Sequence, residues 1–146
     1  MAHIVQQIAE AMVAALDGAT EAGSEVSHRR FWPAEKDKAA EVIVYSDIED
    51  IASAGQGGLL SRAIAFKIAG RFSGDAATLE AKGYTFESAV EIALMTDSTL
   101  GGIATDIVPA MAQTVTDGSG NQPQLTRLLT YTVLAHTLAG FPETPH

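Results

Sequence analysis

The amino-acid sequence predicts an α+β fold: a mostly antiparallel sheet of about four to five strands, packed by two main helices, with a C-terminal hairpin. Apolar residues recur at helical spacing near the start of the chain and again over 86–95. They alternate with polar residues over 59–72 and 125–138, which is typical of strands with one buried face. A Gly-, Asn- and Pro-rich stretch before the last run indicates a connection between antiparallel strands.

Length and charge restrict the protein class. The 146 residues fit one domain, 1–146, which can bury a core without metals or disulfides. The absence of cysteine excludes disulfides, thiolate metal sites and a cysteine nucleophile. Because 18 acidic against 9 basic side chains give a net charge of -9, we expect no specific nucleic-acid binding. No apolar run approaches the roughly 20 residues of a bilayer span, so we expect no membrane partner.

The first elements follow from local patterns. Residues Ile4 to Leu16 predict an amphipathic helix that stops at Gly18. Residues 25–32 predict a strand, which Pro33 ends. The segment 42–45, Val-Ile-Val-Tyr, is apolar on both faces and predicts a short central strand.

The next two segments contrast in composition. Residues 47–58, DIEDIASAGQGG, combine three acids with three glycines and predict a mobile surface loop. Residues 59–72 give the clearest strand pattern, with Ile64, Phe66 and Ile68 on one parity. Fourteen extended residues reach about 46 Å at roughly 3.3 Å each, so we expect either a projecting hairpin arm or a bulge near Gly70.

The second half predicts a helix followed by paired strands. Residues 86–95 form the expected helix, with Thr85 as its cap, and 75–83 upstream is either a short helical turn capped by Asp75 or irregular. Residues 103–116 and 125–138 flank DGSGNQPQ and should be antiparallel neighbours. Pro109 places the first of these two strands at an edge of the sheet.

The sequence predicts no catalytic, cofactor-binding or metal-ligating residues, and hence no enzyme and no cofactor. The four histidines are scattered, and no phosphate-binding loop or nucleophile elbow occurs. Residues 117–121 lack the carboxylates of a calcium loop. An acid/base pair among the acids of 47–50 is less favoured than a solvated loop, because no apolar pocket is predicted there. Arg29 and Arg30 beside two aromatics are better explained as strand-surface charges than as a nucleic-acid patch.

The order of features resembles one protein family. An opening VQQIAEAMVAALDG, the strand LLSRAIAFKIAGRF and the helix FESAVEIAL precede TLGGIATDIVPAMAQTV, DGSGNQ and LTRLLTYTVLAHTLAGFPETP. This succession is similar to the tail terminator (tail completion) proteins of long-tailed bacteriophages and phage-like particles, over nearly the whole chain.

The resemblance implies a virion structural protein that needs no active site. It would form a homohexameric ring on the head-proximal end of the tail tube, stop tube polymerisation and join the tail to the head connector. Its partners would be itself, the tail tube protein and the head connector protein, in a virion tail assembled in the bacterial cytoplasm. The loop would then dock on a partner, through Asp47, Glu49, Asp50, Gln56, Gly57 and Gly58.

Two alternatives remain open at this level. The chain could be another head–tail joining or tail-tube protein. It could also be a non-phage accessory domain that binds a small molecule, which a concave apolar pocket would favour.

Overall fold

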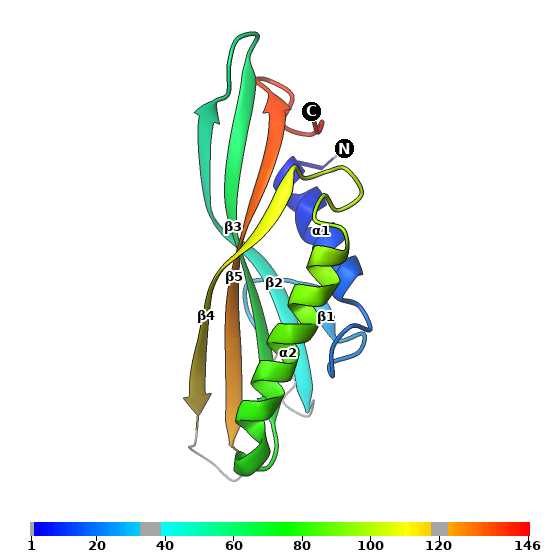
Figure 1. Cartoon of the computed structure of the whole chain (residues 1–146), viewed down its shortest axis with the longest axis vertical. Coiled ribbons are helices and arrows are strands. Elements are labelled where there is room, and N and C mark those ends of the chain that lie inside the picture. Colours follow the sequence, from blue (N-terminus) through cyan, green and yellow to red (C-terminus); the bar gives the residue numbers. More distant parts are fainter. Residues whose placement is uncertain (1, 33–38, 118–122) are drawn as a thin grey trace.

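The computed structural model describes residues 2–32, 39–117 and 123–146, which form one five-stranded sheet and two helices (Figure 1). The strand order is β1-β2-β3-β5-β4, with β1 parallel to β2 and every other neighbouring pair antiparallel. The predicted α+β class and mostly antiparallel sheet are therefore confirmed. In chain order the elements are α1 (Ile4–Leu16), β1 (Val26–His28), β2 (Ala40–Ser53), β3 (Leu59–Ser73), α2 (Ala76–Thr96), β4 (Asp106–Asp117) and β5 (Gln124–Leu138).

Both helices pack on one face of the sheet and share a single core with it. The largest fully buried side chains come from α1, α2 and every strand except β1. In β3 the residues from Arg62 to Phe72 that have even numbers are buried, as the alternation predicts, and Ala69 is buried as well. The core is therefore a two-layer arrangement, and neither of the two described helices lies on the opposite face of the sheet. These core side chains include Ile4, Ile8, Met12, Val42, Ile64, Phe66, Ile68, Phe72, Leu94, Ile107 and Leu129.

Helix α1 is held at its start by residues from the other end of the described chain. The N–H of Ile4 donates to the carbonyl of Pro142 (2.8 Å), and the Gln7 side chain donates to the carbonyls of Glu143 and Ala2, both at 2.6 Å. His3 caps the helix by accepting from the N–H of Val5. The two termini consequently lie close together (Figure 1).

Helix α2 is longer than predicted. It begins at Ala76, where the Asp75 carboxylate accepts from the N–H of Ala77, and runs unbroken to Thr96. The predicted start at Phe86 and the cap at Thr85 are wrong. A buried stripe continues upstream through Leu79 and Gly83, because Gly83 lets the helix approach β5: a Cβ there would lie 3.1 Å from Leu125 Cδ2.

Strand β3 projects as an arm rather than bulging. Its pairing with β5 is uninterrupted from Leu59 to Ser73, so the alternative of a bulge near Gly70 is wrong. The β2–β3 arm extends beyond both helices (Figure 1). Gly70 instead makes room for the ring of Phe86, since a Cβ at Gly70 would lie 2.7 Å from Phe86 Cζ.

Two predictions about the first strands need correction. Residues 47–53 belong to β2, so the predicted loop is reduced to residues 54–58. The pairing of β2 with β3 shifts in register between Ser46 and Glu49 and then continues to Ser53. The strand expected over 25–32 covers only Val26–His28, and Pro33 lies outside the described residues.

Strands β4 and β5 pair antiparallel from Asp106↔Leu134 to Asp117↔Gln124. The edge position indicated by Pro109 is confirmed, because β4 ends the sheet. Residues 118–122, in the connection between these strands, lie outside the described residues. The hairpin turn itself therefore stays a prediction.

Candidate functional site

The residues predicted to form a docking loop lie along one projecting structure, the β2–β3 arm. Asp47 and Asp50 are exposed on β2, and Gln56 to Gly58 are exposed at the turn. Gly57 and Gly58 both have a positive φ near 80°, which favours glycine at the tip. The structure thus keeps these residues together on the arm, but on a strand and its turn instead of one loop.

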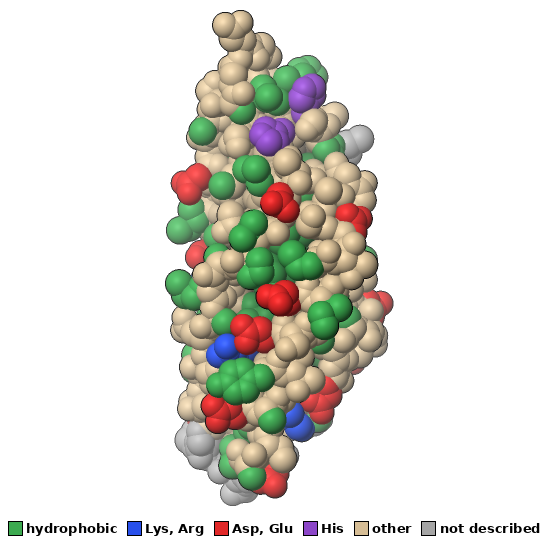
Figure 2. All heavy atoms as spheres, in the orientation of Figure 1, with side chains coloured by type: hydrophobic (Ala, Val, Ile, Leu, Met, Phe, Trp, Pro, Cys, Tyr) green, Lys and Arg blue, Asp and Glu red, His purple; other side chains and the backbone are tan. Residues whose placement is uncertain are grey.

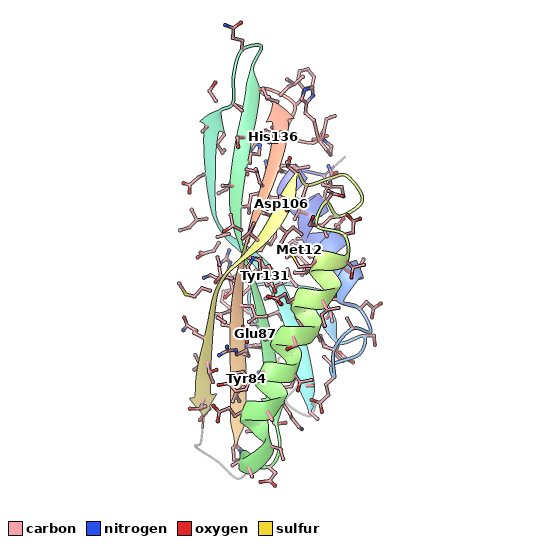
Figure 3. All side chains as sticks on the ribbon, in the orientation of Figure 1. Met12, Tyr84, Glu87, Asp106, Tyr131 and His136 are labelled. Atoms are coloured by element: carbon pink, nitrogen blue, oxygen red, sulfur yellow. The ribbon has the colours of Figure 1, made fainter. Side chains whose placement is uncertain are left out.

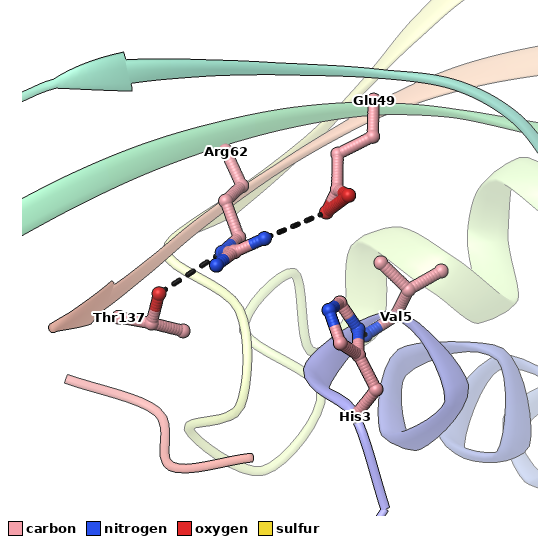
Figure 4. Close-up of polar contacts among 5 residues, drawn as sticks. All are labelled: His3, Val5, Glu49, Arg62 and Thr137. Carbon is pink, nitrogen blue, oxygen red and sulfur yellow. Dashed lines mark hydrogen bonds and ion pairs between the residues drawn. The ribbon is translucent and has the colours of Figure 1, made fainter. Parts of the chain in front are cut away.

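Glu49 differs from the other two acids because its side chain is paired. Arg62 is only 6% exposed and donates from Nη1 to Glu49 Oε2 (3.1 Å) and from Nε to Thr137 Oγ1 (2.9 Å; Figure 4). These contacts link β2, β3 and β5 at the root of the arm. A buried guanidinium needs such partners, since an unpaired charge there would be costly. Glu49 therefore helps to fix the arm, and its docking role stays a prediction.

Strand β2 has an unpaired edge along the arm. Strand β1 pairs only with Val42 to Val44, and Arg30 donates to the carbonyl of Ser46. From Asp47 to Ser53, β2 has no neighbouring strand on that side within the described part of the chain. Ile48 and Ile51 are 60% and 52% exposed there. The edge combines free backbone groups with apolar side chains.

Strand β4 is the opposite unpaired edge. Between Asp106 and Asp117 it contains no charged residue. Val108, Met111 and Val115 are each at least half exposed and pair with Thr132, Thr130 and Thr126, on the face that the helices leave uncovered. A long, neutral, apolar edge invites pairing with another strand. Sequence reasoning placed β4 at an edge but did not identify it as a candidate interaction surface.

The uncovered face of the sheet is itself divided. Near β1, Arg30 stacks on Tyr45 at 5.0 Å and Arg71 on Trp32 at 4.4 Å, while Arg71 also pairs with Glu41. These contacts engage Arg30 in the fold, but Arg29 and Arg30 follow the end of β1 and Phe31 is 79% exposed, so the interpretation of charges on a strand surface needs correction. Toward β4 the side chains on this face are smaller and less polar. They include alternating threonines on β5 and Ala63 and Ala65 on β3.

A cavity of about 260 Å³ lies between α2 and the two last strands. It forms at the register shift between Pro109 and Met111, which takes Ala110 out of the ladder. Tyr131, 2% exposed, lines it, and its hydroxyl makes no hydrogen bond with any described residue. The cavity is lined by Glu87, Glu91, Pro109, Ala110, Met111, Ala112, Leu129 and Tyr131.

Two acidic residues of α2, Glu87 and Glu91, line one side of this cavity. Arg127 donates to Glu87 (2.9 Å) and stacks on Tyr84 (5.3 Å), whereas Glu91 forms no ion pair within the described residues. Burial, with the nearby Glu91 and Glu87 carboxylates, raises the pKa of Tyr131 to about 12. Figure 3 shows Tyr84, Glu87 and Tyr131 along the junction of α2 with the strands. Acidic and hydrophobic side chains alternate down this face, with few basic ones (Figure 2).

Two of the described histidines make local contacts. His3 caps α1, and His136 Nδ1 lies 2.8 Å from Thr105 Oγ1. No cluster of three or more His, Cys, Asp or Glu suited to a metal ion occurs among residues 2–32, 39–117 and 123–146. A larger, open hollow of about 510 Å³ between the helices is lined mainly by alanines. None of the described helices is long and apolar enough to cross a membrane.

No known family model matches the chain, and a search of curated proteins finds no match.

Proposed function

We propose that this chain is a non-catalytic structural protein of a phage or phage-like virion. Copies form a ring on the head-proximal end of the tail tube, stop its polymerisation and join the tail to the head connector. The resemblance of the sequence to tail terminators supplies this identity, the hexameric number, the C-terminal hairpin and the virion tail location. The structure supports the proposal through two free strand edges, one on β2 and one on β4, which could pair with each other.

The proposal is carried by the relative direction of the two free edges. Strands β2, β3, β5 and β4 alternate in direction, so β2 and β4 run opposite to each other. A neighbouring copy rotated about an axis roughly along the strands would therefore present its β2 edge to β4 in antiparallel orientation. Because the two edges differ, the contact is heterologous, and such contacts generate rings when the rotation closes.

The positions of the two free edges along the strand direction are compatible with a closed ring. Through β3, Asp50 lies level with Leu134 of β5, whereas Ala112 in the middle of β4 lies level with Leu129. The edges are thus staggered along the strand direction. Strands in closed sheets are tilted by about 35–45°, and that tilt requires a stagger between the first and last strand of each repeating unit.

The absence of native cysteine allows a direct test of this contact. Ile48→Cys on β2 and Val108→Cys on β4 should be prepared singly and together, then treated with a short bis-maleimide. Head-to-tail pairing predicts that a mixture of the two single variants gives dimers only. The double variant should give a ladder that ends at the closed ring, read by denaturing gel and native mass spectrometry.

Two results would contradict the proposal. Efficient crosslinking of Val108→Cys alone would indicate an isologous β4–β4 dimer, which cannot close a ring by itself. The proposed lateral contact would also be ruled out if the double variant stays monomeric at every protein concentration and when mixed with purified tail tubes. Thr78→Cys, exposed at the start of α2, serves as the matched control and should not crosslink.

A tail-tube protein is the second candidate, because the same edge pairing could build a stacked tube. The two differ in assembly length, which electron microscopy of the purified protein measures. Single rings support the terminator, since its task is to stop growth. Long tubes would identify a tail-tube protein instead.

A further inference from the structure

Three positively charged side chains lack a carboxylate partner in the described chain. Within residues 2–32, 39–117 and 123–146, Arg29, Arg30 and Lys67 form no ion pair. Arg30 donates to the carbonyl of Ser46, and Lys67 donates to the Thr130 hydroxyl. Every other described arginine and lysine is paired with an acid: Arg62 with Glu49, Arg71 with Glu41, Lys82 with Glu21 and Arg127 with Glu87.

The strand register brings these three side chains together on the sheet face away from the helices. Tyr45 on β2 lies directly opposite Lys67 on β3, so their side chains are neighbours on one face, about 5 Å apart at Cβ. The Arg30 guanidinium stacks on the Tyr45 ring at 5.0 Å. Arg29 precedes it, and the N–H of Arg29 donates to the carbonyl of Val44. We define the basic-aromatic patch as Arg29, Arg30, Phe31, Tyr45 and Lys67.

Phe31 is exposed within this patch although both of its chain neighbours are anchored. Its side chain is 79% exposed, while Arg30 before it stacks on Tyr45 and Trp32 after it lies under Arg71 at 4.4 Å. Aromatic and arginine side chains are enriched at protein interfaces and among the residues that dominate their affinity. Anchoring on both sides lowers the ordering cost of binding through Phe31. The patch therefore combines unneutralised charge with a held, exposed aromatic ring.

The charges around the patch restrict what can occupy it. Carboxylates match guanidinium and ammonium groups well. A nucleic acid carries about one charge per 1.7 Å of duplex and would extend from the patch over Asp47 and Asp50, which lie farther along β2. Two copies of this chain repel each other through a net charge of -9 each. A segment of another protein needs negative charge only where it touches the patch.

We propose that the basic-aromatic patch binds a short acidic segment of a different protein. Its carboxylates pair with Arg29, Arg30 and Lys67, and an apolar side chain of the segment packs against Phe31. Arg29 and Phe31 are exposed and free to make these contacts without rearrangement of the sheet. The interaction does not depend on ring formation.

Trp32, the single tryptophan of the chain, reports on the patch in the unmodified protein. The probe is a blocked hexapeptide of alternating glutamate and leucine, compared with the same peptide carrying glutamine in place of glutamate. We expect a saturable change of tryptophan emission with the acidic peptide and a much smaller change with the glutamine peptide. Binding of the acidic peptide should weaken as salt is added, because exposed charges are screened.

Variants identify the groups responsible. Arg29→Gln should weaken binding of the acidic peptide by roughly two- to fivefold, as expected for loss of one exposed ion pair. Phe31→Ser should weaken it as well. Both side chains are exposed, so circular dichroism should show an unchanged fold. Lys82→Gln is the matched control, because Lys82 lies on α2 and pairs with Glu21, and it should leave binding unchanged.

Four outcomes would overturn the proposal. Two are an absence of saturable change with the acidic peptide and an equal change with the glutamine peptide. Tighter binding of oligothymidylate than of the peptide would assign the patch to nucleic acid. Self-association of the protein that Arg29→Gln abolishes would assign it to a second copy. Because the peptide titration needs no ring, its failure is distinguishable from failure of the crosslinking test.

Discussion

At the scale of single residues, Gly70 on β3 leaves room for the ring of Phe86 on α2. A methyl group at Gly70 would lie 2.7 Å from Phe86 Cζ, and Phe86 also packs edge-on against Phe72 at 5.4 Å. We therefore predict that Gly70→Ala lowers the free energy of unfolding by about 1–3 kcal/mol, as overpacked cores do. Urea denaturation followed by circular dichroism measures this change.

A second substitution separates crowding from other effects of the alanine. Gly70→Ala combined with Phe86→Leu should cost less than the sum of the two single changes, because the smaller side chain relieves the contact. If the double variant loses as much free energy of unfolding as the two single variants together, the Phe86 ring is not the source of the destabilisation.

Tyr131 gives a prediction about alkaline pH. Its pKa is raised to about 12 in the folded protein, against 10 for an unhindered tyrosine, so the ionised form is disfavoured by folding. The stabilisation is fully present below pH 10 and is lost as pH rises from 10 through 12. We expect the midpoint of thermal unfolding to fall over this range and to fall less in Tyr131→Phe. Absorbance of the phenolate should show one late-titrating tyrosine; a Tyr131→Phe variant with an unchanged alkaline loss contradicts this.

At the scale of elements, the early start of α2 places a cap at Asp75. Because the Asp75 carboxylate accepts from the N–H of Ala77 at 3.2 Å, we predict that Asp75→Ala lowers the free energy of unfolding by about 1 kcal/mol. Chemical denaturation measures it. Thr85→Ala, inside the helix, is the comparison and should change stability by less. The reverse ranking would restore a helix start near residue 86.

The elements that the sequence predicted well are those with regular local patterns. Apolar spacing located α1, and alternation located β3 and β5, because each buries one face against the core. The sequence left open whether residues 75–83 are helical, because Gly83 and the alanines upstream contribute little hydrophobicity, although Gly83 is where the helix contacts β5. The extension of β2 was missed because Asp47, Glu49 and Asp50 are unusual in a strand.

At the scale of the whole molecule, the β2–β3 arm is the part that extends farthest from the core. Deleting Gln56 to Gly58 should leave the thermal midpoint nearly unchanged, because these residues are exposed and Ser53↔Leu60 still closes the ladder. In the proposed function the same deletion should reduce incorporation into complete particles. Melting curves and particle counts by electron microscopy measure the two effects. Normal particle assembly would count against a docking role for the tip.

The candidate surfaces could be predicted only in part, because they depend on contacts distant in sequence. Pro109 located an edge, but only the fold shows that β2 extends beyond β1 with a free edge and that β4, at the other side of the sheet, runs in the opposite direction. Glu49 is paired with Arg62, thirteen residues away, which no local pattern indicates. Likewise the cavity joins Glu91 to Tyr131, and no spacing rule relates a helix to a strand that follows it by forty residues.

The bonds from residues 4 and 7 to the carbonyls of Pro142 and Glu143 have a consequence for biosynthesis. A nascent chain exposes its first helix long before the ribosome releases the segment that ties it down. Until then, α1 lacks two of its anchors and the sheet lacks β5, the strand that joins β4 to β3. The sheet can therefore be completed, and α1 fully anchored, only after this region has been translated.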